Sequence, residues 1–379
     1  MGQDKPSELS EEEKEELPLT PGELFLWNWS SMIFDTFVQE VGIEKALSAV
    51  KPFYIHAGMA MAQNALKSTG KQKNDLEALV VSCQFIYESI HRDNFLPMLI
   101  KETCAIGETI ACAMRHCRPE ICIAYSHFPT QGMCEAINPN YEILWTQHQT
   151  DGAPTCKFVI KRKEANIKDL EREDMKERTQ RLKLDGQVKE WVRFDVPGEG
   201  GIGLTRVFVD TCGSERTSEL LRGRAMEWGE KVGTARLSEL REKSIGELAA
   251  IVDSYEQSIK QYGKLVNKPN SAEKEIEECP LLSGPAEHCQ QLEAFFNGIC
   301  EAIDPNYEFV YDRMMTRGDK TCHWVIGKKG ELLKEKPNGK TPSSGNNERK
   351  KALKALALKY AQGEITKDEY DELKELIQE

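Results

Sequence analysis

The chain contains one segment twice, and this internal duplication limits its fold more than any other feature. Residues 133–142 and 299–308 share Cys-Glu-Ala-Ile, then Asn or Asp, then Pro-Asn-Tyr-Glu, so that Cys134 matches Cys300. Gly152 matches Gly318 at the same offset in the numbering. A repeat of this kind indicates that one structural unit has been duplicated, so we predict two related lobes.

Most of the cysteines follow the duplication. Of the 12 cysteines, eight form two sets of four with almost the same spacing along the chain. The two sets are Cys112, Cys122, Cys134 and Cys156, and Cys279, Cys289, Cys300 and Cys322. The interval between the second and third cysteine is longer by a single position in the first set, whereas the other two intervals are identical. The first half therefore has one extra residue between its second and third cysteines, and we call this difference the one-residue slip.

Hydrophobic periodicity predicts an α/β protein of the α+β kind, in which each lobe packs helices on a small antiparallel sheet. The predicted helices span 24–37, 43–62, 75–90 and 217–265. Short β-prone runs around the turn at 151–154 predict a hairpin. Two alternating runs within 188–209, joined by a glycine-rich loop, predict a second hairpin.

Composition shifts divide the chain further. The segment 1–19 is strongly acidic, with seven carboxylates against two lysines, and is typical of a tail outside the core. The predicted units are an acidic tail (1–22), a first lobe (23–165), a connector of a charged helix and a β-hairpin (166–216), a second lobe (217–329), a flexible linker (330–348) and a C-terminal helical hairpin (349–379).

Net charge excludes some classes of partner. With a formal charge of −12 and a pI near 5.3, the chain lacks the basic face that nucleic acids or anionic membranes require. No apolar run approaches the roughly 18 residues of a membrane span, and the N-terminus has no secretory signal. We therefore expect a cytoplasmic protein with reduced thiols and no nucleic-acid or membrane partner.

Three motifs of the second repeat carry a family resemblance. They are Glu278-Cys279-Pro280, Gly298-Ile-Cys300-Glu-Ala-Ile-Asp304 and Arg317-Gly-Asp-Lys-Thr-Cys322-His-Trp. They resemble the L-2-amino-thiazoline-4-carboxylic acid hydrolase family, a distant look-alike of the 4-vinyl-reductase ligand-binding domain. The resemblance is clear over 275–327 and looser over 104–161. It implies helices on a small antiparallel sheet around a ligand cavity, and hydrolytic opening of a cyclic C–N bond.

The C-terminal segment carries a separate resemblance. Residues 350–362 form an Ala/Leu/Lys helix pattern, Gly363 is placed to end it, and Thr366 with Glu369 makes a capping box for a second helix. This pattern resembles the short C-terminal oligomerisation module (SHOCT-like) of many bacterial and archaeal proteins. We therefore expect a homo-oligomer held together through this hairpin.

The repeated cysteines allow three interpretations. The first is inert packing, since free cysteine is among the most buried residue types. The second is a metal site for zinc or another transition metal, with the eight repeated cysteines as ligands. The candidate auxiliary ligands are His116, His288, Glu278 and Glu301. Neither half has the tight Cys-x2–4-Cys pair that is usual in structural zinc sites.

The third interpretation is nucleophilic chemistry. Cys300 and Cys322 are the candidate nucleophiles, with Glu301 and His323 as candidate catalytic partners. In an extended strand His323 points to the face opposite Cys322, so the adjacent pair is not by itself a dyad. The fuller motif favours the second lobe as the catalytic one.

These patterns favour a hydrolase-like enzyme that acts on a small cyclic molecule containing sulfur or nitrogen. The competing class is a non-catalytic module that senses or binds a small molecule, a metal or a tetrapyrrole. A third hypothesis is a scaffold whose lobes only present the C-terminal hairpin.

Overall fold

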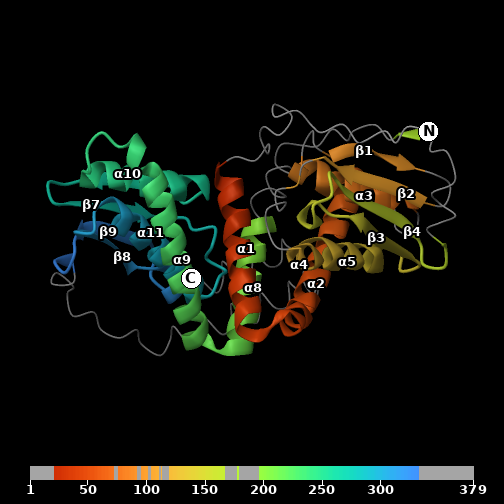
Figure 1. The fold of residues 1–379 in the computed structure, drawn as a ribbon, viewed down its shortest axis with the longest axis horizontal. Helices are drawn as coiled ribbons and strands as arrows, with labels where there is room; N and C mark the ends of the chain where they lie inside the picture. Colours follow the sequence, from red (N-terminus) through yellow and green to blue (C-terminus); the bar gives the residue numbers. More distant parts are fainter. Residues whose placement is uncertain are drawn as a thin grey trace.

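The chain forms two lobes of mixed helix and strand with a pair of helices between them (Figure 1). The structure is a computed structural model, and it describes residues 21–71, 76–91, 95–100, 104–110, 112, 119–166, 177–178 and 196–332. The predicted α+β fold is confirmed, because each lobe packs helices against a small antiparallel sheet.

The first lobe begins with two long helices and contains a five-stranded antiparallel sheet, in which the strand order is β3-β4-β2-β1-β5. Its elements are α1 (Pro21–Val41), α2 (Ile43–Thr69), α3 (Leu76–His91), β1 (Phe95–Ile100), β2 (Cys104–Thr109), α4 (Glu120–Cys122), the π-helical turn η2 (Ile123–His127), α5 (Phe128–Ile137), β3 (Tyr141–Gln147), the 3-10 turn η3 (Gln149–Asp151), β4 (Cys156–Arg162) and β5 (Glu177–Arg178). The predicted helices at 24–37, 43–62 and 75–90 and the predicted hairpin around 151–154 are confirmed.

The second lobe repeats the same order of elements. They are α8 (Val196–Cys212), α9 (Ser214–Arg236), the 3-10 turn η5 (Leu237–Glu239), α10 (Ile245–Ser258), β6 (Gly263–Asn267), β7 (Ser271–Ile276), α11 (Ala286–Ile303), β8 (Tyr307–Arg313), the 3-10 turn η6 (Met315–Arg317) and β9 (Cys322–Lys328). Its sheet order, β6-β7-β9-β8, matches β1-β2-β4-β3 of the first lobe. The duplication therefore extends upstream to α8, which pairs with α1.

The prediction of a β-hairpin over 188–209 is wrong where the structure describes it, since Val196–Cys212 is the helix α8. Its glycines serve close packing rather than a turn. A Cβ at Gly203 would lie 2.0 Å from the Phe53 ring of α2, so any larger residue there would displace this ring. The predicted helix over 217–265 is also corrected, because it divides into α9 and α10 and ends before β6.

Helices α1 and α8 join the two lobes. Both end at a glycine with positive φ, Gly42 at 84° and Gly213 at 85°, where the chain turns into the next long helix. Phe37 of α1 and Phe208 of α8, which occupy matching positions in the repeat, contact each other with ring centroids 4.7 Å apart. The two lobes thus meet through equivalent residues.

The aromatic residues of α1 belong to the core of the second lobe. Phe25 stacks on Trp228 of α9 at 5.0 Å and meets Phe295 of α11 edge-on at 5.3 Å. Trp29 is 2% exposed within the same cluster. The first lobe has a separate core between α2, α3, α5 and its sheet. The first helix that the structure describes, α1, therefore packs into the core of the lobe that is distant from it in sequence.

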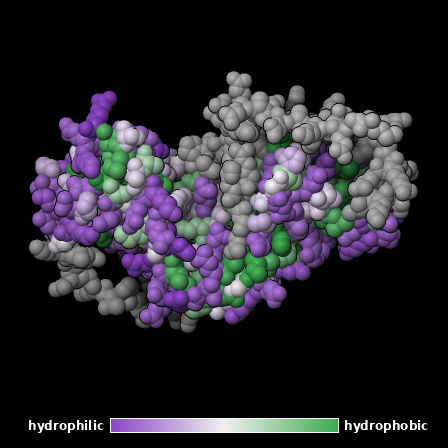
Figure 2. Space-filling view, in the orientation of Figure 1, coloured by the Kyte–Doolittle hydropathy of each residue, from purple (hydrophilic) through white to green (hydrophobic). Residues whose placement is uncertain are grey.

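On the face drawn in Figure 2, hydrophilic residues cover much of the coloured surface, and hydrophobic residues show along its lower centre. Among the described residues, the large hydrophobic residue exposed at the surface is Tyr262, which has a relative solvent exposure of 62%. None of the described helices is both long enough and apolar enough to cross a membrane. Most of the acidic tail (1–22), of the charged connector helix after residue 166 and of the linker (330–348) lies outside the described residues, as does the whole predicted C-terminal hairpin (349–379).

Candidate functional site

Three thiols gather where two strands and a helix meet in the second lobe. Cys279 follows β7, Cys289 lies in the first turns of α11, and Cys322 is the first residue of β9. Ile276 pairs with Cys322 in the sheet, so the chain leaves β7 beside the start of β9. The Cys322 thiol hydrogen bonds to the Cys279 sulfur.

Each of the three sulfurs also accepts a hydrogen bond from its surroundings. The Met315 backbone N–H donates to Cys322 Sγ at 3.2 Å, and the Thr316 hydroxyl donates to Cys289 Sγ at 3.2 Å. The Gln261 side-chain amide donates to Cys279 Sγ at 3.5 Å. Donors directed at sulfur favour the thiolate over the thiol.

The first lobe holds the same cluster in the same place. Cys112 hydrogen bonds to Cys156. The Gln149 N–H donates to Cys156 Sγ at 3.2 Å, and Cys122 Sγ lies 3.2 Å from the Thr150 hydroxyl. The sheet register matches too, because Thr109 pairs with Cys156 as Ile276 does with Cys322. The thiol cluster is therefore a property of the duplicated unit.

The fourth cysteine of each set lies apart from this cluster. Cys289 and Cys300 lie at opposite ends of α11, and at 1.5 Å per residue the helix separates them by roughly 16 Å along its axis. Zn–S bonds are only about 2.3 Å long, so these four thiols cannot share one ion. Cys134 likewise belongs to the core of the first lobe rather than to the cluster that holds Cys122.

Within the second cluster, Cys279 is the thiol best suited to react. It is half-buried, whereas Cys289 and Cys322 are buried. The hydrogen bond from Cys322 lowers the pKa of Cys279, and the Gln261 amide and the Leu281 N–H act in the same direction. Burial raises the pKa of Cys289 to about 12. Of the three thiols in this cluster, Cys279 is therefore the one whose environment favours ionisation.

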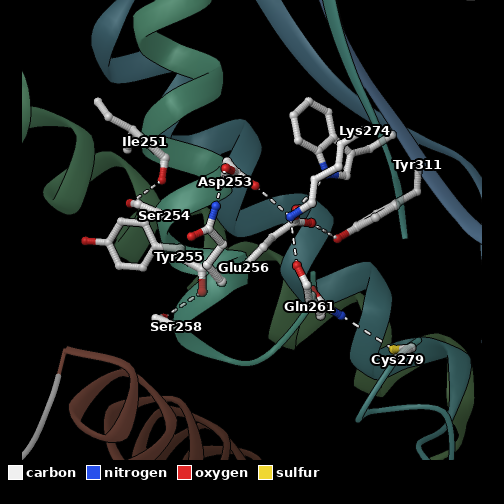
Figure 3. Close-up of polar contacts among 12 residues, drawn as sticks. Ile251, Asp253, Ser254, Tyr255, Glu256, Ser258, Gln261, Lys274, Cys279 and Tyr311 are labelled. Carbon is white, nitrogen blue, oxygen red and sulfur yellow. Dashed lines mark hydrogen bonds and ion pairs between the residues drawn. The ribbon is translucent and has the colours of Figure 1, made fainter. Parts of the chain in front are cut away.

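A buried charged network adjoins this thiol (Figure 3). Lys274 of β7 is fully buried, and its Nζ donates to Asp253 at 2.7 Å, to Glu256 at 3.0 Å and to the Gln261 backbone oxygen at 2.7 Å. The dashed lines in Figure 3 continue from Gln261 to the Cys279 sulfur. The network therefore fixes the residue whose amide holds the reactive thiol.

Glu256 of α10 is the centre of the network. It is also fully buried, and it accepts hydrogen bonds from the Tyr311 hydroxyl at 2.9 Å and from the Trp324 indole at 2.7 Å. Burial raises the pKa of Glu256, while Lys274, Trp324 and Tyr311 act in the opposite direction. Buried charges of this kind need partners, and all of those partners come from α10 and the sheet.

The first lobe has no such charges at the matching positions that the structure describes. Gly107 pairs with Phe158 where Lys274 pairs with Trp324. Tyr87 packs on Trp145 and Phe158 with ring centroids 5.8 and 5.2 Å away, and these two residues match Tyr311 and Trp324 of the second lobe. Among the residues that the structure describes, the two lobes therefore share the thiols but not the buried lysine of the network. This difference distinguishes the second lobe chemically.

The structure does not bring the predicted catalytic residues together. Cys300 is fully buried in α11 and burial raises its pKa, which makes it a poor nucleophile. Glu301 forms an ion pair with Lys329 at 3.1 Å. His323 lies on the opposite face of β9 from Cys322, as expected, and its Nδ1 is 2.7 Å from Asp312. Of the four, only Cys322 belongs to the thiol cluster.

The candidate auxiliary metal ligands also lie elsewhere. His288 is buried with its Nδ1 3.2 Å from the Thr205 hydroxyl of α8, and burial lowers its pKa to about 4. Glu278 is exposed, and His116 lies outside the described residues. In the described part of the chain, no three His, Cys, Asp or Glu side chains are arranged to hold a metal ion.

Sequence reasoning missed Lys274, Glu256 and Gln261. One signal for Lys274 was present, because Ala272, Lys274 and Ile276 alternate on one face of β7 and all three are buried. A charged residue between two inward apolar residues indicates a buried partner of opposite charge. An open hollow of about 460 Å³ on α9 is lined by Glu227, Glu230, Lys231 and Thr234, and no cysteine contributes to it.

Comparisons with known proteins give no neighbour for this site. No family model, no curated protein and no solved structure matches the chain.

Proposed function

We propose that the chain is a hydrolase-like enzyme that opens a C–N bond of a small cyclic molecule containing sulfur or nitrogen, and that its second lobe is the catalytic one. The observation that carries this proposal is the state of Cys279. This thiol is half-buried, accepts hydrogen bonds from Cys322 and Gln261, and has a lowered pKa. The resemblance of the motifs around Cys279 and Cys322 supports the same class of reaction.

The arrangement provides the parts that such a reaction needs. The Cys279 thiolate forms a bond to the carbon of a C=N group, and the nitrogen takes the proton that Cys322 supplies. The C–N bond of this tetrahedral adduct then breaks: the exocyclic 2-amino nitrogen re-forms a C=N bond to the carbon and passes a proton to the ring nitrogen, which leaves as the amine. Water adds across that C=N bond, its remaining proton returns to Cys322 as the carbonyl forms, and the Cys279 thiolate leaves. Cys279 takes the nucleophile's role that the sequence assigned to Cys300 and Cys322, because Cys300 is sealed in the core and the thiol of Cys322 is also buried.

Turnover tests this proposal. We expect Cys279→Ser to reduce kcat/KM for a 2-amino-thiazoline carboxylate on the order of 1,000-fold or more, as loss of a catalytic nucleophile does. Cys212→Ser is the matched control, because Cys212 is the other half-buried cysteine among those described and lies on α8, outside both clusters. Full activity of the Cys279→Ser variant would exclude Cys279 as the nucleophile.

Selective alkylation tests the thiolate without a substrate. We expect iodoacetamide at neutral pH to modify Cys279 faster than Cys212, because the pKa of Cys279 is lowered by its hydrogen bonds whereas burial raises that of Cys212. Mass spectrometry of peptides after timed labelling measures both rates in one sample. Faster labelling of Cys212 would contradict the assigned ionisation of Cys279.

A non-catalytic function is the competing proposal. The observation that favours it is the recurrence of the three thiols in the first lobe, where the matching described positions lack the charged network. A small molecule, a soft metal or a tetrapyrrole bound through the thiols would use both lobes alike. Metal analysis and absorption spectra of anaerobically purified protein would detect such a ligand, and stoichiometric binding to both lobes without turnover would favour this function.

We also propose that the protein is cytoplasmic and forms homo-oligomers through residues 349–379. None of the described cysteines forms a disulfide, which fits a reducing compartment. The sequence of the C-terminal hairpin predicts an apolar stripe that needs a partner surface, made of Leu353, Leu356, Leu358, Leu373, Leu376 and Ile377. Light scattering of a chain that ends before residue 340 tests the idea, because an unchanged oligomeric state would exclude the hairpin as the interface.

A further inference from the structure

Two imidazoles meet in the first lobe, outside the thiol cluster. His127 ends the π-helical turn η2 and His148 follows β3, and their Nε2 atoms are 3.1 Å apart. The two rings are nearly parallel, with an interplanar angle of 20° and centroids 5.0 Å apart. Trp145 stacks over both rings, with centroids 5.4 Å from His148 and 6.1 Å from His127.

The fold does not require this pair. Met314 occupies the position of His148 in the second lobe, and α11 has no π-helical turn. The first lobe has one residue more between Cys122 and Cys134 than the second has between Cys289 and Cys300, and η2 lies within that interval. The π-helical turn therefore accommodates the extra residue of the first lobe. Such turns occur frequently at functional sites.

The two nitrogens are close enough to hydrogen bond to each other, and their separation also suits two ligands of one ion. With metal–nitrogen bonds of about 2.05 Å, two atoms 3.1 Å apart subtend about 98° at the metal, between the square-planar and tetrahedral values. The pair is also in the right state, because metal ligation needs neutral imidazole. Burial lowers the pKa of His127 to about 4, and it lowers the pKa of His148 as well.

We propose that His127 and His148 form a binding site for a divalent transition-metal ion. Imidazole nitrogens select Co2+, Ni2+, Cu2+ and Zn2+ over Mg2+ and Ca2+. The carboxylate of Asp151 lies close enough to act electrostatically on both imidazoles, and its charge favours a cation there. No third ligating side chain among the described residues completes the site, so water or a bound molecule fills the remaining positions.

Titration with Co2+ tests the site in the full-length, anaerobically purified chain. Co2+ bound by nitrogen and oxygen lacks the strong near-ultraviolet charge-transfer absorption of Co2+ bound by thiolate, so the spectrum separates this site from the cysteines. We expect one Co2+ per chain without thiolate absorption. His127→Ala and His148→Ala each weaken binding at least about 10-fold, since the loss of groups that only support a ligand already costs that much.

The controls keep the proposal open to refutation. His56→Ala removes an exposed histidine from α2 and leaves the affinity for Co2+ unchanged. His148→Met introduces the residue of the second lobe, so it keeps the fold and still loses binding. Co2+ binding that survives in both His127→Ala and His148→Met, binding with thiolate absorption alone, or no binding at all would each overturn the site.

Discussion

Replacement of Lys274 by methionine is expected to destabilise the second lobe by about 3–5 kcal/mol, which is the usual effect of removing one partner from a buried ion pair. Both Lys274 and Glu256 have fully buried side chains, and Lys274 donates to two carboxylates and one backbone carbonyl. Methionine fills a similar volume but leaves the Glu256 carboxylate without its cation. Chemical denaturation followed by tryptophan fluorescence measures the loss, because Trp324 donates to the same carboxylate.

Lys264→Met is the matched control for this change. Lys264 lies on the adjacent strand β6 and is exposed, so its replacement is expected to change the free energy of unfolding by less than about 0.5 kcal/mol. A second variant, Lys274→Met with Glu256→Gln, removes both charges and should recover part of the loss. If Lys274→Met alone were as stable as Lys264→Met, the network would not be the buried ionic centre described above.

The same substitution reports on the thiol. Lys274 holds the Gln261 backbone oxygen, and the Gln261 amide donates to Cys279. We therefore expect slower alkylation of Cys279 in folded Lys274→Met at neutral pH, while the alkylation rate of Cys212 stays unchanged. This link between a buried lysine and a half-buried cysteine belongs to the second lobe, because Gly107 occupies the matching position in the first.

The duplication and the general architecture could be predicted from the sequence because they depend on local and repeated signals. The hairpin around Gly152 and the three helices before it follow from turn residues and helical spacing. Helix α8 could not be predicted in this way. Its glycines look like a turn in isolation, and only the approach of Phe53 to Gly203 shows that they serve packing between helices.

The candidate site was predictable as a set of cysteines but not as a geometry. The repeat identified Cys279, Cys289 and Cys322 with Cys300 as one group, and the length of α11 then separates Cys300 from the others. The exposure that makes Cys279 rather than Cys300 the reactive thiol is a tertiary property. The partners of Lys274 come from α10 and from the turn after it, so no local pattern joins them.

The second large effect on stability is expected where two helices are in close contact. In each lobe two helices cross at a pair of glycines. In the second lobe, a Cβ at Gly229 of α9 would lie 2.0 Å from the Phe295 carbonyl oxygen, and one at Gly298 of α11 would lie 2.2 Å from the Met226 oxygen. Gly58 and Gly132 make the same contacts between α2 and α5 in the first lobe.

We expect Gly229→Ala to lower the free energy of unfolding by about 1–3 kcal/mol, because α9 and α11 must move apart and overpacking of this kind is costly. Gly223→Ala is the control on the same helix. Gly223 is exposed and has no atom within 4 Å of its Cβ position, so alanine there should stabilise the helix by up to about 1 kcal/mol. Thermal unfolding of both variants therefore gives shifts of opposite sign. If Gly229→Ala stabilised the protein, α9 and α11 would not cross at these glycines. The crossing would then not be what holds in place the first turns of α11, where Cys289 of the thiol cluster lies.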